Sequence, residues 1–113
     1  MTQRPAKTHL GGKWEFPGGK VEAGEDPKET VVRECREECA IDIEVRDILE
    51  VTFHSYPEKD VLLLFWECAL VGGTVQHLGV ADHQWIHPAS VADLDLPPAD
   101  LPLATKLRAR FPV

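Results

Sequence analysis

The sequence predicts a single α/β domain in which a β-sheet is packed between helices. Three stretches indicate this architecture: an amphipathic helix from about residue 27 to 39, strand-like segments after it, and a second amphipathic helix from about 103 to 111. With 113 residues the chain is long enough for one modest hydrophobic core. No internal repeat or linker divides it, so we expect residues 1–113 to form one domain.

The first helix has clear start signals and an apolar side. Asp26 can cap the helix, Pro27 suits its first turn, and Glu29 stands three residues after Asp26, as a capping box requires. Cys35 and Cys39 lie one helical turn apart, on an arc that would pack against a core. We therefore expect one face of this helix to lie against the sheet.

The strands are predicted from periodicity. Residues 13–16 form a short strand that leads into a glycine turn, and residues 41–54 begin with alternating aliphatic and polar side chains. Residues 61–70 are almost all apolar, which predicts a central strand covered on both faces.

A row of glutamates borders the apolar arc of the first helix. At roughly 100° per residue, Glu34, Glu37 and Glu38 fall within about 100° of one another. The simpler interpretation is a solvated acidic face. However, Glu34 and Glu38 are a like-charge i,i+4 pair near the end of the helix where the helix dipole disfavours carboxylates. Such a cluster is typical of a site for a hard divalent cation.

One motif spans residues 19–41 with the spacing G-x5-E-x7-R-E-U-x-E-E-x-G-U, in which U is a bulky aliphatic residue. Its positions are held by Gly19, Glu25, Arg33, Glu34, Cys35, Glu37, Glu38, Ala40 and Ile41. The motif resembles the signature of the Nudix hydrolases. Two positions differ, since Cys35 stands where an aliphatic residue is usual and Ala40 replaces the final glycine. The second difference matters only if the helix ends at Ala40 in a left-handed turn.

The flanking segments KWEFPGGKVE and LPPADLPLATKL resemble the MutT-type branch of this family, which includes 8-oxo-dGTP and CTP-type pyrophosphohydrolases. The resemblance covers nearly the whole chain from Arg4 onward. It implies the Nudix fold, with a mixed β-sheet sandwiched between helices. It also implies a first strand upstream of Met1, so the chain is expected to be N-terminally truncated relative to the family. Either the true start lies upstream, or a homodimer or strand exchange covers the apolar strand edge left open.

The resemblance implies a magnesium site, at which Mn²⁺ can substitute. Glu34, Glu37 and Glu38 would be the catalytic metal ligands, with the backbone carbonyl of Gly19 as a further one. Arg33 matches the position whose guanidinium orients these glutamates. The alternative for Arg33 is a surface pair with Glu37, worth only a few tenths of a kcal/mol.

The resemblance also implies residues that bind the substrate. Arg4 matches an arginine that reaches the nucleotide. Phe16 can stack on the base, although it is equally suited to the core. Asp100 falls where related enzymes place a residue that faces the base, and its alternative role is to cap the last helix before Leu103. Glu25 is expected to close the glycine loop onto the helix.

Many relatives carry a further glutamate in the loop before the HQW segment. This chain has no glutamate after Glu67, and the matching position is Gly79. Asp82 or His83 could substitute, although a solvent-exposed role is the commoner one for such residues in a loop.

The net charge is −7 and the isoelectric point is near 5.1. Without a basic patch, a nucleic-acid polymer is not expected as a partner, whereas a free nucleotide with its own metal ions is compatible. The longest apolar run, residues 61–66, is too short for a membrane span, so a cytoplasmic location is expected.

The resemblance implies a Mg²⁺-dependent nucleoside triphosphate pyrophosphohydrolase of the kind that sanitises nucleotide pools. It would convert an NTP or dNTP, with 8-oxo-dGTP among the candidates, to a nucleoside monophosphate and pyrophosphate. The alternative is a catalytically weak or inactive domain that binds a nucleotide or metal.

Overall fold

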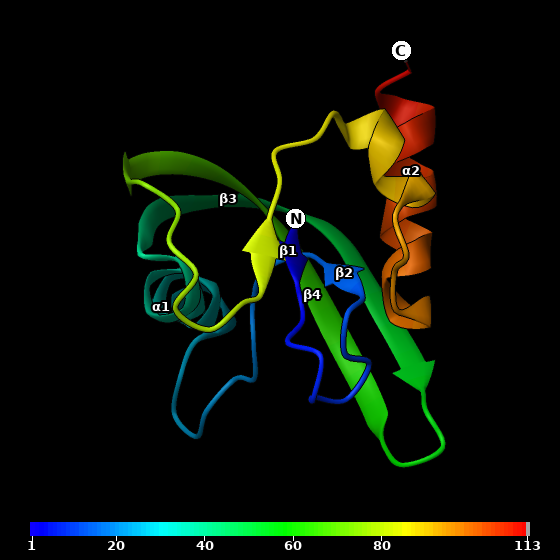
Figure 1. Cartoon of the computed structure of the whole chain (residues 1–113), viewed down its shortest axis with the longest axis horizontal. Helices are drawn as coiled ribbons and strands as arrows, with labels where there is room; N and C mark the ends of the chain where they lie inside the picture. Colours follow the sequence, from blue (N-terminus) through cyan, green and yellow to red (C-terminus); the bar gives the residue numbers. More distant parts are fainter. Residues whose placement is uncertain (113) are drawn as a thin grey trace.

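The computed structural model describes residues 1–112, and its elements form the layered α/β domain predicted from the sequence (Figure 1). A helix lies on either side of the strands, α1 beside the start of β3 and α2 along its later part. No helix within these residues is long and apolar enough to cross a membrane. The elements are β1 (Thr2–Gln3), β2 (Trp14–Glu15), α1 (Pro27–Cys39), β3 (Ile41–Ser55), β4 (Asp60–Gly73), β5 (Asp82–His83), the 3₁₀ turns η1 (Pro88–Asp93) and η2 (Pro98–Asp100), and α2 (Leu101–Arg110).

The strands pair in two antiparallel sheets. The first has the order β2-β1-β5, with Thr2 opposite both Glu15 and His83, and the second is the β3-β4 hairpin. This differs from the one mixed sheet that the family resemblance implies.

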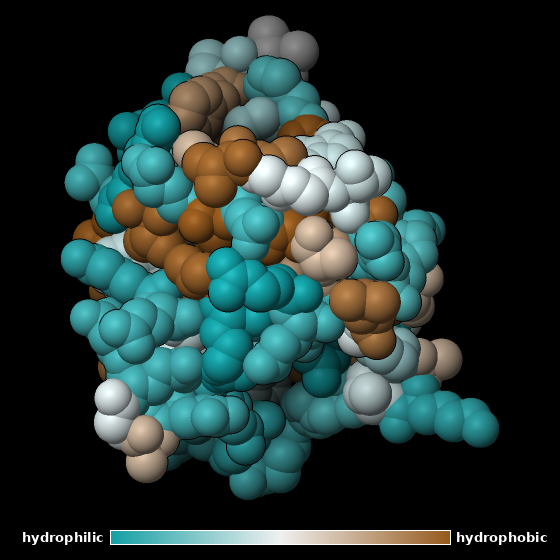
Figure 2. All heavy atoms as spheres, turned by 90° about the vertical axis from the view of Figure 1, so that its left-hand side faces the viewer, coloured by the Kyte–Doolittle hydropathy of each residue, from teal (hydrophilic) through white to brown (hydrophobic). Residues whose placement is uncertain are grey.

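The prediction that residues 61–70 form a central strand covered on both faces is wrong. Within residues 1–112, β4 is hydrogen-bonded to β3 alone, and 65% of Leu62 and 49% of Leu70 are exposed. An apolar run shows that a strand avoids polar residues, but it does not show which elements cover it. Figure 2, which views the molecule from the α1 side, shows apolar residues gathered above a broad polar area.

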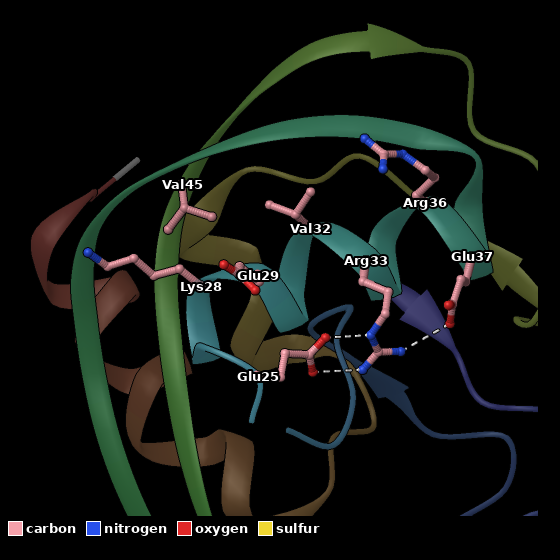
Figure 3. A pocket seen from close by; sticks show the side chains of 8 residues that line it. All are labelled: Glu25, Lys28, Glu29, Val32, Arg33, Arg36, Glu37 and Val45. Carbon is pink, nitrogen blue, oxygen red and sulfur yellow. Dashed lines mark hydrogen bonds and ion pairs between the residues drawn. The ribbon is translucent and has the colours of Figure 1, made fainter. Parts of the chain in front are cut away.

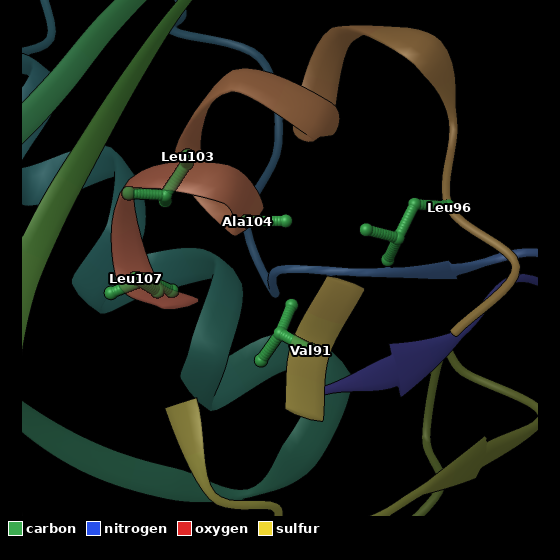
Figure 4. Packing of buried hydrophobic residues seen from close by; sticks show 5 residues of the cluster. All are labelled: Val91, Leu96, Leu103, Ala104 and Leu107. Atoms are coloured by element: carbon green, nitrogen blue, oxygen red, sulfur yellow. The ribbon is translucent and has the colours of Figure 1, made fainter. Parts of the chain in front are cut away.

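Two clusters of buried side chains hold the helices in place. The smaller one joins Cys35 and Cys39 of α1 to Ile41 of β3. The larger one packs α2 against η1 and the preceding loop (Figure 4). It therefore fixes the start of α2, which the candidate site residue Asp100 directly precedes. Its buried members are Val91, Leu96, Leu103, Ala104 and Leu107.

Local signals fix both ends of α1. The Oδ1 atom of Asp26 accepts a hydrogen bond of 2.8 Å from the backbone N–H of Lys28, as predicted for a cap. At the other end, Ala40 adopts the left-handed conformation with φ 59° and ψ 29°, and its N–H donates to the Arg36 carbonyl. The left-handed turn at the final motif position is therefore present, and it is made by a residue with a Cβ.

We expect Ala40→Gly to raise the free energy of unfolding by about 0.5–1 kcal/mol. Relief of the left-handed strain is worth roughly 1–2 kcal/mol, and the more flexible unfolded chain of the glycine variant offsets part of it. Ala109→Gly, at an exposed right-handed position of α2, is the matched control and should destabilise by up to about 1 kcal/mol. Urea unfolding of the two variants measures both signs, and equal destabilisation would contradict this account.

Candidate active site

Arg33 of α1 is bonded to most of the charged motif residues (Figure 3). Its Nε and Nη2 atoms donate to the two oxygens of Glu25 at 2.7 and 3.1 Å. Its Nη1 atom donates to Glu34 at 2.8 Å and to Glu37 at 3.1 Å, and Nη2 also donates to the carbonyl of Lys20 at 3.1 Å. The surface pair with Glu37 is thus one contact of several. The planar guanidinium joins the glycine loop to the glutamates of the helix.

Glu25 closes the loop onto α1, as predicted. Its Oε1 atom accepts hydrogen bonds from the Thr30 hydroxyl at 2.7 Å and from the backbone N–H of Glu22 at 3.2 Å. The hydrogen bond from Arg33, with that from Thr30, lowers the pKa of Glu25 to about 2. The same partnership raises the pKa of Arg33. Both groups are therefore charged at neutral pH, and the loop is held by an ionised pair.

Glu34 and Glu38 lie side by side on the inner side of α1. Burial, followed by the nearby charges of Glu34 and Glu15, raises the pKa of Glu38 to about 7. Glu34 lies directly against Gly19, because a Cβ built on Gly19 would be 2.3 Å from its carboxyl carbon. Glycine at this position lets the loop approach the carboxylate closely.

Glu37 lies apart from this pair. Its side chain is 59% exposed and contacts Arg33 on the outer side of the helix. There it borders a hollow of about 560 Å³ between α1 and β3, lined by Lys28, Val32 and Val45 among others (Figure 3). Within residues 1–112, the oxygens of the three motif glutamates do not all come within 4.8 Å of one another. The structure therefore brings Glu34 and Glu38 together and leaves Glu37 at the rim.

This arrangement fits a divalent cation. Half-buried carboxylates of like charge repel each other unless a proton or a cation intervenes. The pKa of Glu38 is raised by burial first and by the charge of Glu34 second, so both causes favour a proton or a cation here. Carboxylate and backbone carbonyl oxygens are the ligands that Mg²⁺ takes in proteins. Glu34 and Glu38 could hold it, with the Gly19 carbonyl nearby on the loop that touches Glu34.

Glu15 of β2 was missed in the sequence analysis. Its charge contributes to the raised pKa of Glu38. Both of its oxygens accept hydrogen bonds of 3.1 Å from Nη1 of Arg4. Burial raises the pKa of Glu15, and Arg4 opposes that shift. Its signal was an acidic residue between the aromatic Trp14 and Phe16 in a predicted strand. Arg4, which was predicted to reach the nucleotide, is therefore hydrogen-bonded to Glu15, whose charge acts on Glu38.

Phe16 and Asp100 are the two remaining residues predicted to bind the substrate. Phe16 packs edge-on against Phe65 with ring centroids 5.4 Å apart and borders the large core cluster. Asp100 is 6% exposed, and its Oδ2 atom has no hydrogen-bond partner. Although Asp100 precedes α2, its side chain makes no capping hydrogen bond, so the capping alternative is wrong. Burial, followed by the charge of Glu15, raises the pKa of Asp100 to about 7.

We expect Asp100→Asn to stabilise the protein at pH 8 and to change it little at pH 4. The folded pKa of Asp100 is about 7, well above the unfolded value of about 3.9, so the unfolded chain binds fewer protons between these values. Stability therefore falls as pH rises from about 4 to 7, by roughly 4 kcal/mol at most. Urea unfolding at both pH values measures it, with Asp47→Asn at an exposed position as the control. An equal effect of Asp100→Asn at both pH values would contradict it.

The loop after β4 covers the end of α1. The backbone N–H groups of Leu78 and Gly79 donate to the carbonyl of Glu38 at 3.0 and 3.1 Å. A Cβ on Gly79 would be 3.1 Å from Cγ of Glu38, so the position that the family resemblance matches to a glutamate lies against the helix glutamate. The carboxylate of Asp82 is directed instead to His77 and to the backbone of His83. The structure thus does not place Asp82 as a substitute for that glutamate.

Comparison with known proteins finds relatives in both sequence and structure. A family model described as a NUDIX domain matches residues 1–106. The 8-oxo-dGTP diphosphatase of Escherichia coli K12 is 33% identical over 108 residues, which cover 96% of this chain and 84% of that protein. The CTP pyrophosphohydrolase of the same organism is 35% identical over 106 residues, covering 91% and 76%. The solution structure of the E. coli ORF135 protein superposes with a TM-score of 0.79 at 33% identity, covering 99% of this chain and 82% of that one.

Proposed function

Because this chain belongs to the Nudix hydrolase family, whose members cleave phosphoanhydride bonds, we propose that it is a Mg²⁺-dependent nucleoside triphosphate pyrophosphohydrolase. Its products would be a nucleoside monophosphate and pyrophosphate. The observation that carries the proposal is the half-buried pair of Glu34 and Glu38, whose repulsion a divalent cation would relieve.

The residues have distinct roles in this proposal. Pyrophosphate cleavage requires neutralisation of charge on the phosphate oxygens and activation of an in-line water, and bound Mg²⁺ supplies both. Glu34 and Glu38 bind the metal, with Glu37 and the Gly19 carbonyl as further candidate ligands. Arg33 fixes the orientation of Glu34 through its 2.8 Å hydrogen bond and so keeps the pair ready for the cation.

Base recognition is assigned to Phe16 and Asp100. A buried carboxyl group with a pKa near 7 and an unpartnered oxygen can exchange one hydrogen bond with a base edge, either as donor or as acceptor. Phe16 offers an aromatic edge beside it, and Arg4 offers a cation to the nucleotide while balancing Glu15. The relatives support a purine or a pyrimidine nucleotide, since their names include both 8-oxo-dGTP and CTP.

The experiment that tests the proposal is the specificity constant kcat/KM for a panel of dGTP, 8-oxo-dGTP, CTP and dCTP, with the products separated by ion-exchange chromatography. We expect a nucleoside monophosphate and pyrophosphate as the products, with one nucleotide preferred over the others. Release of inorganic phosphate and a nucleoside diphosphate would contradict the proposal, because it would mean that the bond between the β- and γ-phosphates is cleaved.

The alternative is a domain that binds a nucleotide and metal but turns over weakly. It is favoured by the glycine at position 79, where many relatives carry a glutamate, since this removes one carboxylate from the side of Glu38. Both proposals expect Mg²⁺-dependent nucleotide binding, which calorimetry measures. Tight binding without product in the panel above would select the alternative.

We also propose that a second copy of the chain covers the free edge of β4. Among residues 1–112 this strand is paired on one side alone, and Leu62, Leu70 and Val71 are 65%, 49% and 60% exposed. Open apolar edges favour strand addition. Light scattering should give a dimer mass at concentrations where the protein is active, and a monomer mass throughout would contradict this.

A further inference from the structure

Two histidines and an aspartate meet where the loop after β4 returns to β5. The Nε2 atom of His77 lies 2.7 Å from Nδ1 of His83 and 3.8 Å from Oδ1 of Asp82. One ligand atom from each of the three residues lies within 4.8 Å of the others. His77 and Asp82 have side chains 41% and 54% exposed, so a solute can reach the cluster.

The backbone on both sides of this cluster is anchored. The loop that carries His77 donates from Gln76 to the carbonyl of Cys39 at 2.9 Å and from Leu78 to the carbonyl of Glu38 at 3.0 Å, at the end of α1. His83 and Asp82 are paired with Thr2 and Gln3 of β1. The three side chains therefore come from two segments that other elements hold in place, and their proximity does not depend on a free loop.

From this juxtaposition we propose that His77, Asp82 and His83 form a binding site for a divalent transition metal, with Zn²⁺ as the reference ion. The proposal goes beyond the pyrophosphohydrolase, because it assigns a second metal site outside the glutamates of α1. Imidazole nitrogens are the ligands that Zn²⁺, Co²⁺ and Ni²⁺ take, whereas Mg²⁺ prefers oxygen. The cluster therefore selects a different ion from the one proposed for Glu34 and Glu38.

The geometry needs little change to hold such an ion. Metal–nitrogen distances of about 2.0–2.1 Å at a tetrahedral angle place two ligand nitrogens roughly 3.3 Å apart. The present 2.7 Å between the rings must open by about half an ångström, and the 3.8 Å to Asp82 must close by a similar amount. Rotations of exposed side chains can supply both movements. Three protein ligands leave a coordination position for water.

The competing explanation is a hydrogen bond between two neutral imidazole rings, one as donor and the other as acceptor. That bond accounts for the 2.7 Å contact of His77 and His83. The carboxylate of Asp82 faces the same Nε2 atom of His77, and its Oδ1 atom also accepts the backbone N–H of His83 at 2.7 Å. The two explanations differ in a measurable way, because only the metal site binds an added ion with a defined stoichiometry.

The test is competition for Zn²⁺ against a chromogenic chelator, using the whole chain in buffer with millimolar Mg²⁺ to occupy the glutamates. We expect one equivalent of Zn²⁺ per chain. His77→Gln and Asp82→Asn should each weaken binding at least about 10-fold, since even the loss of an outer-shell partner costs 10–100-fold. Circular dichroism checks that both variants are folded. Co²⁺ absorption in the visible range provides a second readout of ligand geometry.

Two control variants separate this site from others. His54→Gln removes a histidine outside the cluster and should bind Zn²⁺ as the unmodified chain does. Glu38→Gln alters the proposed magnesium site and should also leave Zn²⁺ binding unchanged, so failure of the proposed hydrolase and failure of this site are distinguishable. No Zn²⁺ binding by the unmodified chain, or unchanged affinity in both His77→Gln and Asp82→Asn, would overturn the proposal.

Discussion

Glu38→Gln is expected to lower the rate of pyrophosphate release by about 10³-fold, because a neutral amide cannot replace a carboxylate in holding Mg²⁺ beside Glu34. A metal ion contributes several kcal/mol of transition-state stabilisation, and each 1.36 kcal/mol corresponds to a factor of ten in rate. The fold should remain intact, and stability should not fall, because the substitution removes a charge that burial and the repulsion from Glu34 both disfavour. Steady-state pyrophosphate release and urea unfolding measure the two effects.

The matched control for this substitution is Glu29→Gln, in the exposed first turn of the same helix. It should keep the full rate. Glu34→Gln should resemble Glu38→Gln, and Glu37→Gln should also lose activity if its rim carboxylate joins the metal. Full activity in both Glu34→Gln and Glu38→Gln would show that this pair does not bind the catalytic metal.

Arg33→Lys is expected to lower the rate by about 10²-fold and to reduce stability, although it conserves the charge. Lysine has one ammonium group and cannot reproduce the five hydrogen bonds that Arg33 donates to Glu25, Glu34, Glu37 and the Lys20 carbonyl. Loss of the bond to Glu34 frees a carboxylate that should be held in place, and misplacement of a catalytic group by about 1 Å costs about 10²-fold.

A positioning role for Arg33 predicts a specific kinetic pattern. The Mg²⁺ concentration that gives half the maximal rate should rise in Arg33→Lys, which a purely structural role would not produce. Arg36→Lys is the control, since Arg36 is 65% exposed and pairs with Asp42. Its rate should be unchanged. An Arg33→Lys variant that loses stability but keeps both the rate and the Mg²⁺ dependence would leave Arg33 as a structural residue alone.

Local signals explain which parts of the fold were predictable. The cap at Asp26 and the spacing of α1 act within one helix, so the sequence predicts its bounds of Pro27–Cys39. The coverage of β4 depends on elements distant in sequence, and an apolar run cannot reveal it. The left-handed end of α1 was predictable only as a condition, because Ala40 does not carry the usual glycine signal.

The candidate site was predictable from helix geometry only in part. Glu37 lies at one end of the predicted acidic arc, and Glu38 lies at the other. The spacing puts Glu38 nearer than Glu37 to the apolar arc of Cys35 and Cys39. The structure accordingly places Glu38 inside and Glu37 at the rim. Glu15 and Asp100 join the site from a strand and from the start of α2, through contacts that tertiary packing creates. No spacing within one segment predicts such contacts.

The most direct test of the central claim is pyrophosphate release from the preferred nucleotide with Mg²⁺, with EDTA, and after Mg²⁺ is restored. The account predicts release that stops in EDTA and returns with the metal, because the carboxylates of Glu34 and Glu38 act through the cation they hold. Release that persists in EDTA, or a folded protein that releases no pyrophosphate from any nucleotide of the panel with Mg²⁺ present, would contradict it.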